Sequence, residues 1–273
     1  MIDLSIIIIN FNTKKLIIDC LRSLEKEQSK INKEIIVIDN GSTDGSLKAL
    51  QKIKIRDANI KLIANQKNLG FAKAANQGIK KAQGEYLFFL NSDTQVKKDT
   101  LGKLISFIKK KSKTAIVGPK LLNLDGSVQA SVFHFPTFQR AVREFWLKEK
   151  KAFSKYVPSA DEAVEVEAVA GAAMLAKKKL LKRVGFFNEK YFMYYEDLDL
   201  CRRLAKIGCK IYYLPSAAVV HHHGASGKNS APPAEQWRRL IPSSKIYHGT
   251  VKHYIMQLII WWGLKWQKAF GKN

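Results

Sequence analysis

Residues 4–39 read LSIIIINFNTKKLIIDCLRSLEKEQSKINKEIIVID, and this stretch decides the fold. It opens with a continuous apolar run at 4–9, which is typical of a strand that is covered on both faces. Apolar residues then recur at helical spacing from Leu16 to Leu24, and a second apolar run follows at 34–39. A strand, a helix and a strand in this order predict a parallel pair of strands with a right-handed crossover.

The same alternation continues to about residue 118. Further apolar runs predict strands at 60–65, 85–93 and 114–119. Helical spacing predicts helices around 47–53, 71–84 and 101–108. Polar clusters follow three of the strands, at 10–12, 39–42 and 91–93. We therefore expect an α/β fold with a Rossmann-like, doubly wound, mostly parallel sheet, in which ligands bind beyond the carboxyl ends of the strands.

The second half is less regular. Residues 121–131 predict a hairpin with an Asp-Gly turn, and residues 134–165 predict a mobile loop or lid. A strand is expected over 164–178 and a helix over 196–205. Two further strands are expected at 209–215 and 217–223.

The chain is strongly basic, with 47 Lys and Arg against 23 Asp and Glu among 273 residues. This balance indicates an anionic partner, but no Arg-rich block carries interleaved aromatic residues, so a nucleic acid is not expected. The three cysteines form no CxxC pair, which argues against a disulfide framework and favours a reducing compartment. No stretch is long and apolar enough for a membrane span.

The last part, residues 236–273, contains no acidic side chain and several lysines and tryptophans. Six apolar residues would share one helical face: Tyr247, Val251, Tyr254, Ile255, Leu258 and Trp262. A basic amphipathic helix with tryptophans is typical of one that lies in an anionic membrane interface. The alternative is a helix packed on the domain itself.

Two carboxylates follow predicted strands in the first half. Asp39 is placed to accept hydrogen bonds from a base or a ribose, or alternatively to begin an Asx-turn. Asp93 is suited to Mg²⁺ or Mn²⁺, which prefer oxygen ligands, or alternatively to a helix cap. No GxGxxG fingerprint is present, so a dinucleotide fold of the oxidoreductase type is not indicated.

Two clusters stand out in the second half. Glu196, Asp197 and Asp199 follow a run of aromatic residues, and they would form either a general base site or an acidic first turn of a helix. Asp199 would pair with arginines at helical spacing. Of three consecutive histidines, His221 and His223 share one strand face, as metal ligands or as a solvated strand end.

Taken together and in order, these segments resemble the family 2 glycosyltransferases, which are inverting enzymes of the GT-A fold, and rhamnosyltransferase-type bacterial members in particular. The matching segments are SIIIINFNTKKLIIDCLRSL (5–24), EIIVIDNGSTDGS (34–46), NLGFAKAANQGI (68–79), GEYLFFLNSDT (84–94), GAAMLAKK (171–178), YFMYYEDLDLCRRLAKIG (191–208) and VVHHHGAS (219–226).

The resemblance implies roles on the sugar-donor side. The residues expected to contact the nucleotide-sugar are Asn10, Asn12, Asp39, Gly70, Lys73, Asn76, Ser92 and Asp93. Asn91-Ser92-Asp93 stands at the DXD motif of the family, with Asn91 replacing the first Asp. Asp93 and His221 are the implied ligands of a divalent metal, Mg²⁺ or Mn²⁺.

On the acceptor side, the resemblance implies Asp197 as the catalytic base. Glu196 is the second catalytic candidate, which would position the acceptor or support the start of the helix. Gly171 and Ala172 would border the acceptor site. Residues 1–235 would form the GT-A domain, with a nucleotide-sugar-binding half (1–118) and an acceptor half (119–235). Residues 236–273 would form a membrane-associating tail.

The implied function is transfer of a sugar, with rhamnose favoured, from a dTDP- or UDP-type sugar donor to a hydroxyl group. The acceptor would be a glycan or a polyprenyl-diphosphate-linked glycan in cell-surface polysaccharide synthesis, at the cytoplasmic face of the cell membrane. Alternatives are a UDP- or GDP-hexose donor, or a non-catalytic nucleotide-sugar or glycan-binding protein of the same fold. A nucleotidyltransferase would be expected to show a Gly-rich phosphate loop, which the N-terminal segment lacks.

Overall fold

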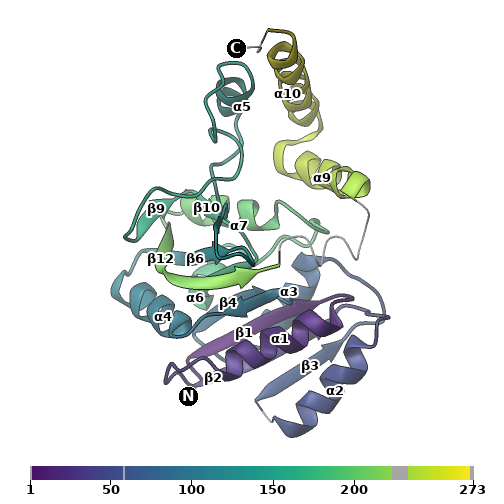
Figure 1. Cartoon of the computed structure of the whole chain (residues 1–273), viewed down its shortest axis with the longest axis vertical. Helices are drawn as coiled ribbons and strands as arrows, with labels where there is room; N and C mark the ends of the chain where they lie inside the picture. Colours follow the sequence, from purple (N-terminus) through teal and green to yellow (C-terminus); the bar gives the residue numbers. More distant parts are fainter. Residues whose placement is uncertain (1, 58, 223–232, 271–273) are drawn as a thin grey trace.

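The first half of the chain forms the parallel part of a large sheet. The structure is a computed structural model that describes residues 2–57, 59–222 and 233–270. The parallel strands lie in the order β3 (Ile60–Ala64), β2 (Lys33–Asp39), β1 (Leu4–Asn10) and β4 (Tyr86–Asn91). The connecting helices are α1 (Lys14–Glu25), α2 (Ser46–Arg56) and α3 (Phe71–Lys81) (Figure 1). The predicted strand–helix alternation is confirmed.

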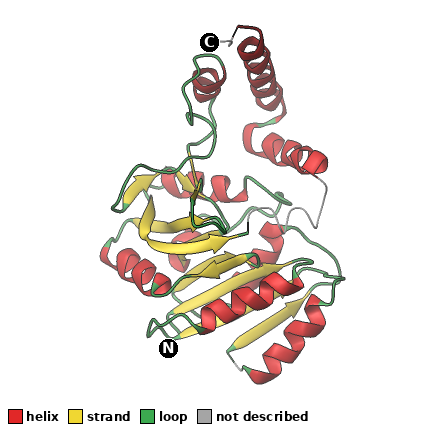
Figure 2. Ribbon diagram, in the orientation of Figure 1, coloured by secondary structure: helices red, strands yellow, loops and turns green. Residues whose placement is uncertain are grey.

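Helices cover both faces of this sheet (Figure 2). Ile6 and Ile8 of β1 belong to the hydrophobic cluster that includes α1, α2 and α4 (Thr100–Lys110). Ile7, between them, belongs to the cluster on the other face, with α3. Because successive side chains of a strand point to opposite faces, an uninterrupted apolar run is what a strand between two helical layers requires.

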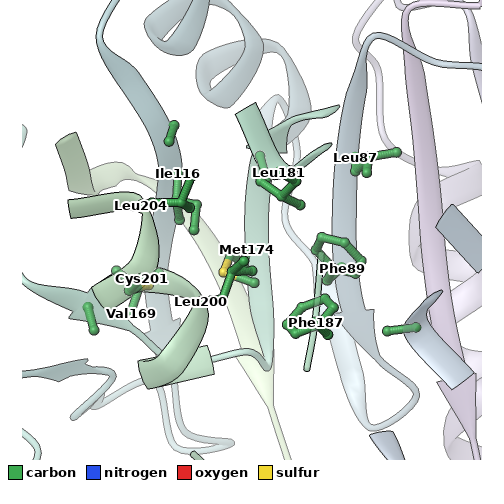
Figure 3. Packing of buried hydrophobic residues seen from close by; sticks show 14 of the residues in the cluster. Leu87, Phe89, Ile116, Val169, Met174, Leu181, Phe187, Leu200, Cys201 and Leu204 are labelled. Atoms are coloured by element: carbon green, nitrogen blue, oxygen red, sulfur yellow. The ribbon is translucent and has the colours of Figure 1, made fainter. Parts of the chain in front are cut away.

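The second half extends the sheet with mixed directions. β11 (Ala173–Lys177) lies antiparallel between β4 and β6 (Thr114–Leu122). β12 (Lys210–His221) runs parallel to β6, and β5 (Thr94–Val96) closes the edge antiparallel to β12. Helices α6 (Lys178–Arg183) and α7 (Glu196–Lys206) cover the face that α3 covers. Figure 3 shows Leu200 and Leu204 of α7 beside Met174 and Ile116 of the sheet.

Two strand predictions in this half are wrong in detail. Residues 164–178 form three strands, β9 (Val164–Val166), β10 (Ala168–Val169) and β11, because each pairs with a different partner. Residues 210–221 form one strand with a register shift between Leu214 and Ala218. Pro215 falls in that irregularity, where a residue without an N–H is tolerated. His223 lies outside the described residues.

The predicted hairpin is confirmed, and the predicted loop contains a helix. β7 (Val128–Gln129) pairs antiparallel with the end of β6, and Gly126 takes a φ of 84° in the turn. Within residues 134–165 the chain forms α5 (Phe138–Phe145). The short β8 (Val132–Phe133) precedes it and pairs with β10. Helix α5 lies away from the sheet, beside the C-terminal helix (Figure 1).

The tail forms two helices, α9 (Pro233–His248) and α10 (Thr250–Phe270), with Gly249 between them at a φ of 82°. The predicted single apolar face is therefore wrong at Tyr247, which lies in the last turn of α9 and is buried against Tyr195 with 5.2 Å between ring centroids. The other five residues lie on α10 and are exposed. No helix among the described residues combines the length and apolarity that crossing a bilayer requires.

Candidate active site

The predicted site residues of the two halves meet at one cavity. It measures about 230 Å³ and lies beyond the carboxyl ends of β1 and β4. The predicted residues that line it are Asp93, Gly171, Ala172, Glu196, Asp197 and His221. These residues run from position 93 to position 221, so side chains that are distant in the chain lie together at this edge of the sheet.

Asp93 and His221 lie side by side on the wall of this cavity. Asp93 Oδ1 is 3.5 Å from His221 Nε2, and both side chains are buried. The other ring nitrogen of His221, Nδ1, lies 2.7 Å from Gln129 Oε1, and Gln129 Nε2 donates to Asn123 Oδ1. Because an amide oxygen only accepts, Nδ1 carries a proton, and Nε2 is the ring nitrogen that faces Asp93.

This pair fits a divalent metal in its donor chemistry. A carboxylate oxygen and an imidazole nitrogen suit Mg²⁺ or Mn²⁺, and a hydrogen bond that orients the far ring nitrogen is usual for a metal-binding histidine. Asn91 lines the same cavity. Within the described ranges no cluster of three His, Cys, Asp or Glu side chains is present.

Asp197 lies at the N-terminus of α7. Two hydrogen bonds, made by the neighbouring residues Gly171 and Ala172, connect it to the end of β4. Gly171 N donates to Asp197 Oδ2 at 3.0 Å, and Ala172 O accepts from Asn91 N at 2.9 Å. Asp197 Oδ1 also accepts from Leu198 N at 2.8 Å. The predicted acceptor-side glycine thus fixes the predicted base at a set position relative to the end of β4.

Glu196 is buried beside Asp197. Burial, and secondarily the charge of Asp197, raises the pKa of Glu196 from its ordinary value to about 8. Its Oε2 makes no hydrogen bond within the described part of the chain, and its side chain faces the cavity. Burial therefore favours the protonated form of the Glu196 carboxyl group.

Asp199, the third acid of the cluster, faces away from this chemistry. It is buried and accepts from Arg203 Nε at 2.7 Å, and Arg202 approaches it at 3.5 Å. The predicted pairing at helical spacing is confirmed. The three neighbouring acids thus differ in their surroundings. Asp197 is half-buried at the cavity, Glu196 is buried and has a raised pKa, and Asp199 is held in a structural ion pair.

The nucleotide-side residues from the first strands form a network with one another. Asn10 Nδ2 donates to Asp39 Oδ1 at 2.8 Å, and Ser42 N donates to Asp39 Oδ2 at 3.1 Å. Asn12 Oδ1 accepts from Thr43 N at 2.8 Å. Asn10 and Asp39 are fully buried, so here they hold the two loops together. Their contact with a nucleotide stays a prediction.

Gly70, Asn76 and Lys73 lie on or next to α3, outside the cavity lining. Gly70 takes a φ of 82°, and a Cβ there would lie 2.4 Å from Phe192 O, so only glycine permits this close approach. Asn76 Nδ2 donates to Phe187 O at 2.9 Å, which anchors the loop before α7. Lys73 is exposed. Their nucleotide contacts also stay predictions.

Ser92 is buried, with its hydroxyl 2.7 Å from Thr13 Oγ1. Several lining residues were not predicted from the sequence: Phe11, Asn40, Asn68, Phe71 and Lys155. Asn40 belongs to the polar turn after β2, so its position at a strand end was an available signal. Lys155 lies in a segment without regular spacing and gave no such signal.

A second, larger cavity of about 640 Å³ adjoins the first through Glu196, Asp197, Tyr194 and Lys155, which line both. Its remaining wall comes mainly from aromatic and apolar side chains of α5, α9 and the segments that flank α5. Residues of the loop before α7 line both cavities. Tyr194 and Tyr195 of that loop take φ values of 69° and 68°, and Ser243 of α9 donates to Met193 O at 2.7 Å.

Two solved structures with a similar fold are glycosyltransferases. GalNAc-T7, crystallised with UDP, GalNAc and Mn²⁺, aligns over 81% of this chain and 43% of its own, with a TM-score of 0.66 and 18% identity. The mannosyltransferase PcManGT from Pyrobaculum calidifontis, in complex with GDP-Man and Mn²⁺, aligns over 93% of this chain and 64% of its own, with a TM-score of 0.61 and 19% identity. The fold is the expected GT-A fold.

A curated relative matches at the level of sequence. N-acetylglucosaminyl-diphospho-decaprenol L-rhamnosyltransferase of Mycobacterium tuberculosis is 30% identical over 210 residues, which are 70% of this chain and 67% of the relative. The profile described as Glycosyl transferase family 2 matches residues 5–159. With the fold and the cavity already described, these matches show that the chain belongs to glycosyl transferase family 2.

Proposed function

We propose that this glycosyltransferase is metal-assisted and inverting, and that it moves a sugar, with rhamnose favoured, from a dTDP- or UDP-linked donor to a hydroxyl of a glycan or polyprenyl-diphosphate-linked acceptor. The observation that supports this proposal is that Asp93, His221 and Asp197 line one cavity. The name of the M. tuberculosis relative supports rhamnose as the sugar and a lipid diphosphate as the acceptor class.

On the donor side, Asp93 and His221 Nε2 would hold a Mg²⁺ or Mn²⁺ ion, which when bound supplies positive charge for the departing diphosphate. Gln129 keeps the His221 ring in the orientation and tautomer that this needs. Asn10, Asn12, Asp39 and Ser92 fix the loops around the nucleotide.

On the acceptor side, Asp197 receives the proton of the attacking hydroxyl. The hydroxyl oxygen forms a bond to the anomeric carbon while the bond from that carbon to the diphosphate oxygen breaks, so attack from the opposite face inverts the configuration. The Gly171 N–H holds Asp197 Oδ2, which orients the carboxylate for this transfer. Glu196, protonated, donates a hydrogen bond that positions the acceptor.

We also propose a division of labour along the chain. Residues 1–235 form the catalytic domain, with the nucleotide-sugar half at 1–118 and the acceptor half at 119–235. Residues 236–273 attach the protein to the anionic cytoplasmic face of the cell membrane. The exposed apolar residues of α10 and the neighbouring Lys252, Lys265 and Lys268 support this, since each lysine near an anionic surface contributes about 1 kcal/mol.

A thermal-shift panel of dTDP-rhamnose, UDP-hexoses and GDP-mannose, each with and without Mn²⁺ or Mg²⁺, tests the proposal together with a transfer assay. A donor at 100 times its Kd should stabilise the protein by about 2.7 kcal/mol. The effect should be larger with metal, and it should be reduced by Asp93→Asn. Stabilisation by none of these nucleotides, or no effect of metal on any of them, would contradict the proposal.

A further inference from the structure

We propose that the second cavity binds the prenyl diphosphate portion of the acceptor, with Lys155 at the diphosphate and with Phe145, Phe153 and Leu240 along the prenyl chain. This inference rests on the proposed function, because it assigns the part of the acceptor that follows the reacting sugar. It makes the chain specific for lipid-linked acceptors through its own side chains, independently of any attachment of the tail to a membrane.

The first argument is the course of the cavity. It is lined by Asp197 and Glu196 of α7 and also by Phe145 of α5 and Leu240 of α9. In Figure 1, α7 lies against the sheet, while α5 lies beyond it toward the tail. A molecule whose hydroxyl meets Asp197 therefore extends away from the sugar donor and toward α5. The volume of about 640 Å³ is large enough for a sugar and several further groups.

The second argument is the chemistry of the wall near α5. The rings of Phe145 and Phe153 lie 5.9 Å apart, centroid to centroid. Ser154, the polar neighbour in the lining, donates its hydroxyl to Glu144, which also accepts from the backbone N–H groups of residues 153 and 154. This wall consequently offers ring faces and aliphatic carbon, which suit a hydrocarbon chain better than sugar hydroxyls.

The third argument is charge. Lys155 lines both cavities and is exposed, with its Nζ 5.1 Å above the Phe133 ring. Lys148, Lys150 and Lys151 belong to the same segment, whose acid, Glu149, is paired with Arg143. A positive charge thus lies between the reacting end and the apolar wall. That is where a glycosyl diphosphate lipid carries its negative charges.

The fourth argument is continuity with an apolar surface. Trp146, next to Phe145, donates its Nε1–H to Ile259 O of α10 at 2.9 Å, and Gln267 of α10 donates to Phe145 O at 3.0 Å. The outward face of α10 exposes Leu258 by 56% and Trp262 by 54%. A prenyl chain that leaves the cavity past α5 would therefore meet further apolar side chains instead of water.

The test is calorimetric binding of farnesyl diphosphate, inorganic diphosphate and farnesol to the full chain, in EDTA so that metal does not hold a diphosphate at Asp93. We expect farnesyl diphosphate to bind at least tenfold more tightly than either of the other two probes. Leu240→Asn and Lys155→Gln should each weaken it about fivefold or more. The matched surface controls Leu124→Asn and Lys48→Gln, and Asp93→Asn, should leave it unchanged.

Equal binding of farnesyl diphosphate and inorganic diphosphate would overturn the inference, as would wild-type binding by both Leu240→Asn and Lys155→Gln. If farnesyl diphosphate does not bind, while a lipid-free oligosaccharide binds and is weakened by Leu240→Asn and Lys155→Gln, the cavity belongs to a glycan and the inference is overturned. A cooperative thermal unfolding transition, measured on the same proteins without ligand, shows that they are folded. If no nucleotide shifts this transition while farnesyl diphosphate still binds, the proposed function is contradicted and the cavity assignment stands.

Discussion

The two halves of the active site are stabilised in different ways. On the nucleotide side, Asn10 and Asp39 are fully buried and satisfy each other and the adjacent turn. On the acceptor side, Asp197 and Glu196 face two cavities, and Glu196 keeps an oxygen without a partner among the described residues. The polar groups of the first half therefore bind one another and hold the loops after β1 and β2 together. The second half leaves polar groups at a cavity, where a substrate could bind them. The following predictions test this contrast.

The largest effect is expected at Asp197. Asp197→Asn keeps the shape of the side chain but removes the proton acceptor, so kcat should fall by about 10²-fold or more. The nucleotide thermal shift should stay as in the wild type, because the sugar-donor half is untouched. Steady-state transfer kinetics measure the effect, and wild-type turnover by this variant would remove Asp197 from its role.

The next effect is expected at Glu196, through pH. Burial and the charge of Asp197 raise its pKa from 4.5 to about 8. Between these values the folded protein holds a proton that the unfolded chain has released, so the free energy of unfolding falls as pH rises through this interval. The loss is on the order of a few kcal/mol and levels off above the folded-state pKa.

Glu196→Gln should remove this contribution, because glutamine does not titrate. Urea denaturation at several pH values between the two pKa values measures it, with the wild type as reference. The variant should lose less stability than the wild type toward the alkaline end. An identical pH dependence in both proteins would show that Glu196 is not a proton-holding group.

A smaller effect, on stability alone, is expected at Asp199. Asp199→Asn leaves the buried end of Arg203 without its charged partner and should lower the free energy of unfolding by about 2 kcal/mol. Because Asp199 does not line the cavity, its replacement acts on catalysis only indirectly. We expect kcat to change by less than about fivefold. A loss of kcat as large as that of Asp197→Asn would erase the distinction between these two acids.

The smallest effect is expected on the exposed face of α10. Replacing Trp261 and Trp262, which are 47% and 54% exposed, by serine should weaken binding to anionic vesicles by about fivefold or more. The replacement Ile55→Ser, at an exposed apolar residue of α2, is the control. Co-sedimentation measures the effect. Unchanged binding by the tryptophan variant would favour the alternative in which the tail packs on other protein surface.

The two halves also differ in how well the sequence predicts their structure. In β1, α1 and β2, apolar periodicity and strand order lie within one short stretch, so local reasoning gives the fold. The division of residues 164–178 into three strands depends on pairing with β4, β8 and β12, which are distant in sequence. The break at Gly249 has only a single glycine as its signal.

For the site as well, local patterns predict some residues, while other features depend on packing between distant segments. The carboxyl ends of strands predict that Asp39 and Asp93 lie at the ligand edge, and the resemblance to the family singles out Asp197 from the acidic run. That Asn10 and Asp39 bind each other, and that Gly171 orients Asp197, are properties of packing between distant segments. Lys155 and the second cavity depend on α5 and α9, whose meeting no local pattern indicates.

The most direct test of the central claim is the anomeric configuration of the sugar in the product of a single turnover, determined by nuclear magnetic resonance. The proposed single base at Asp197, with the proposed diphosphate site at Asp93 and His221, predicts a product whose configuration is inverted relative to the donor. A product with retained configuration would require a second displacement and would contradict this account of the site.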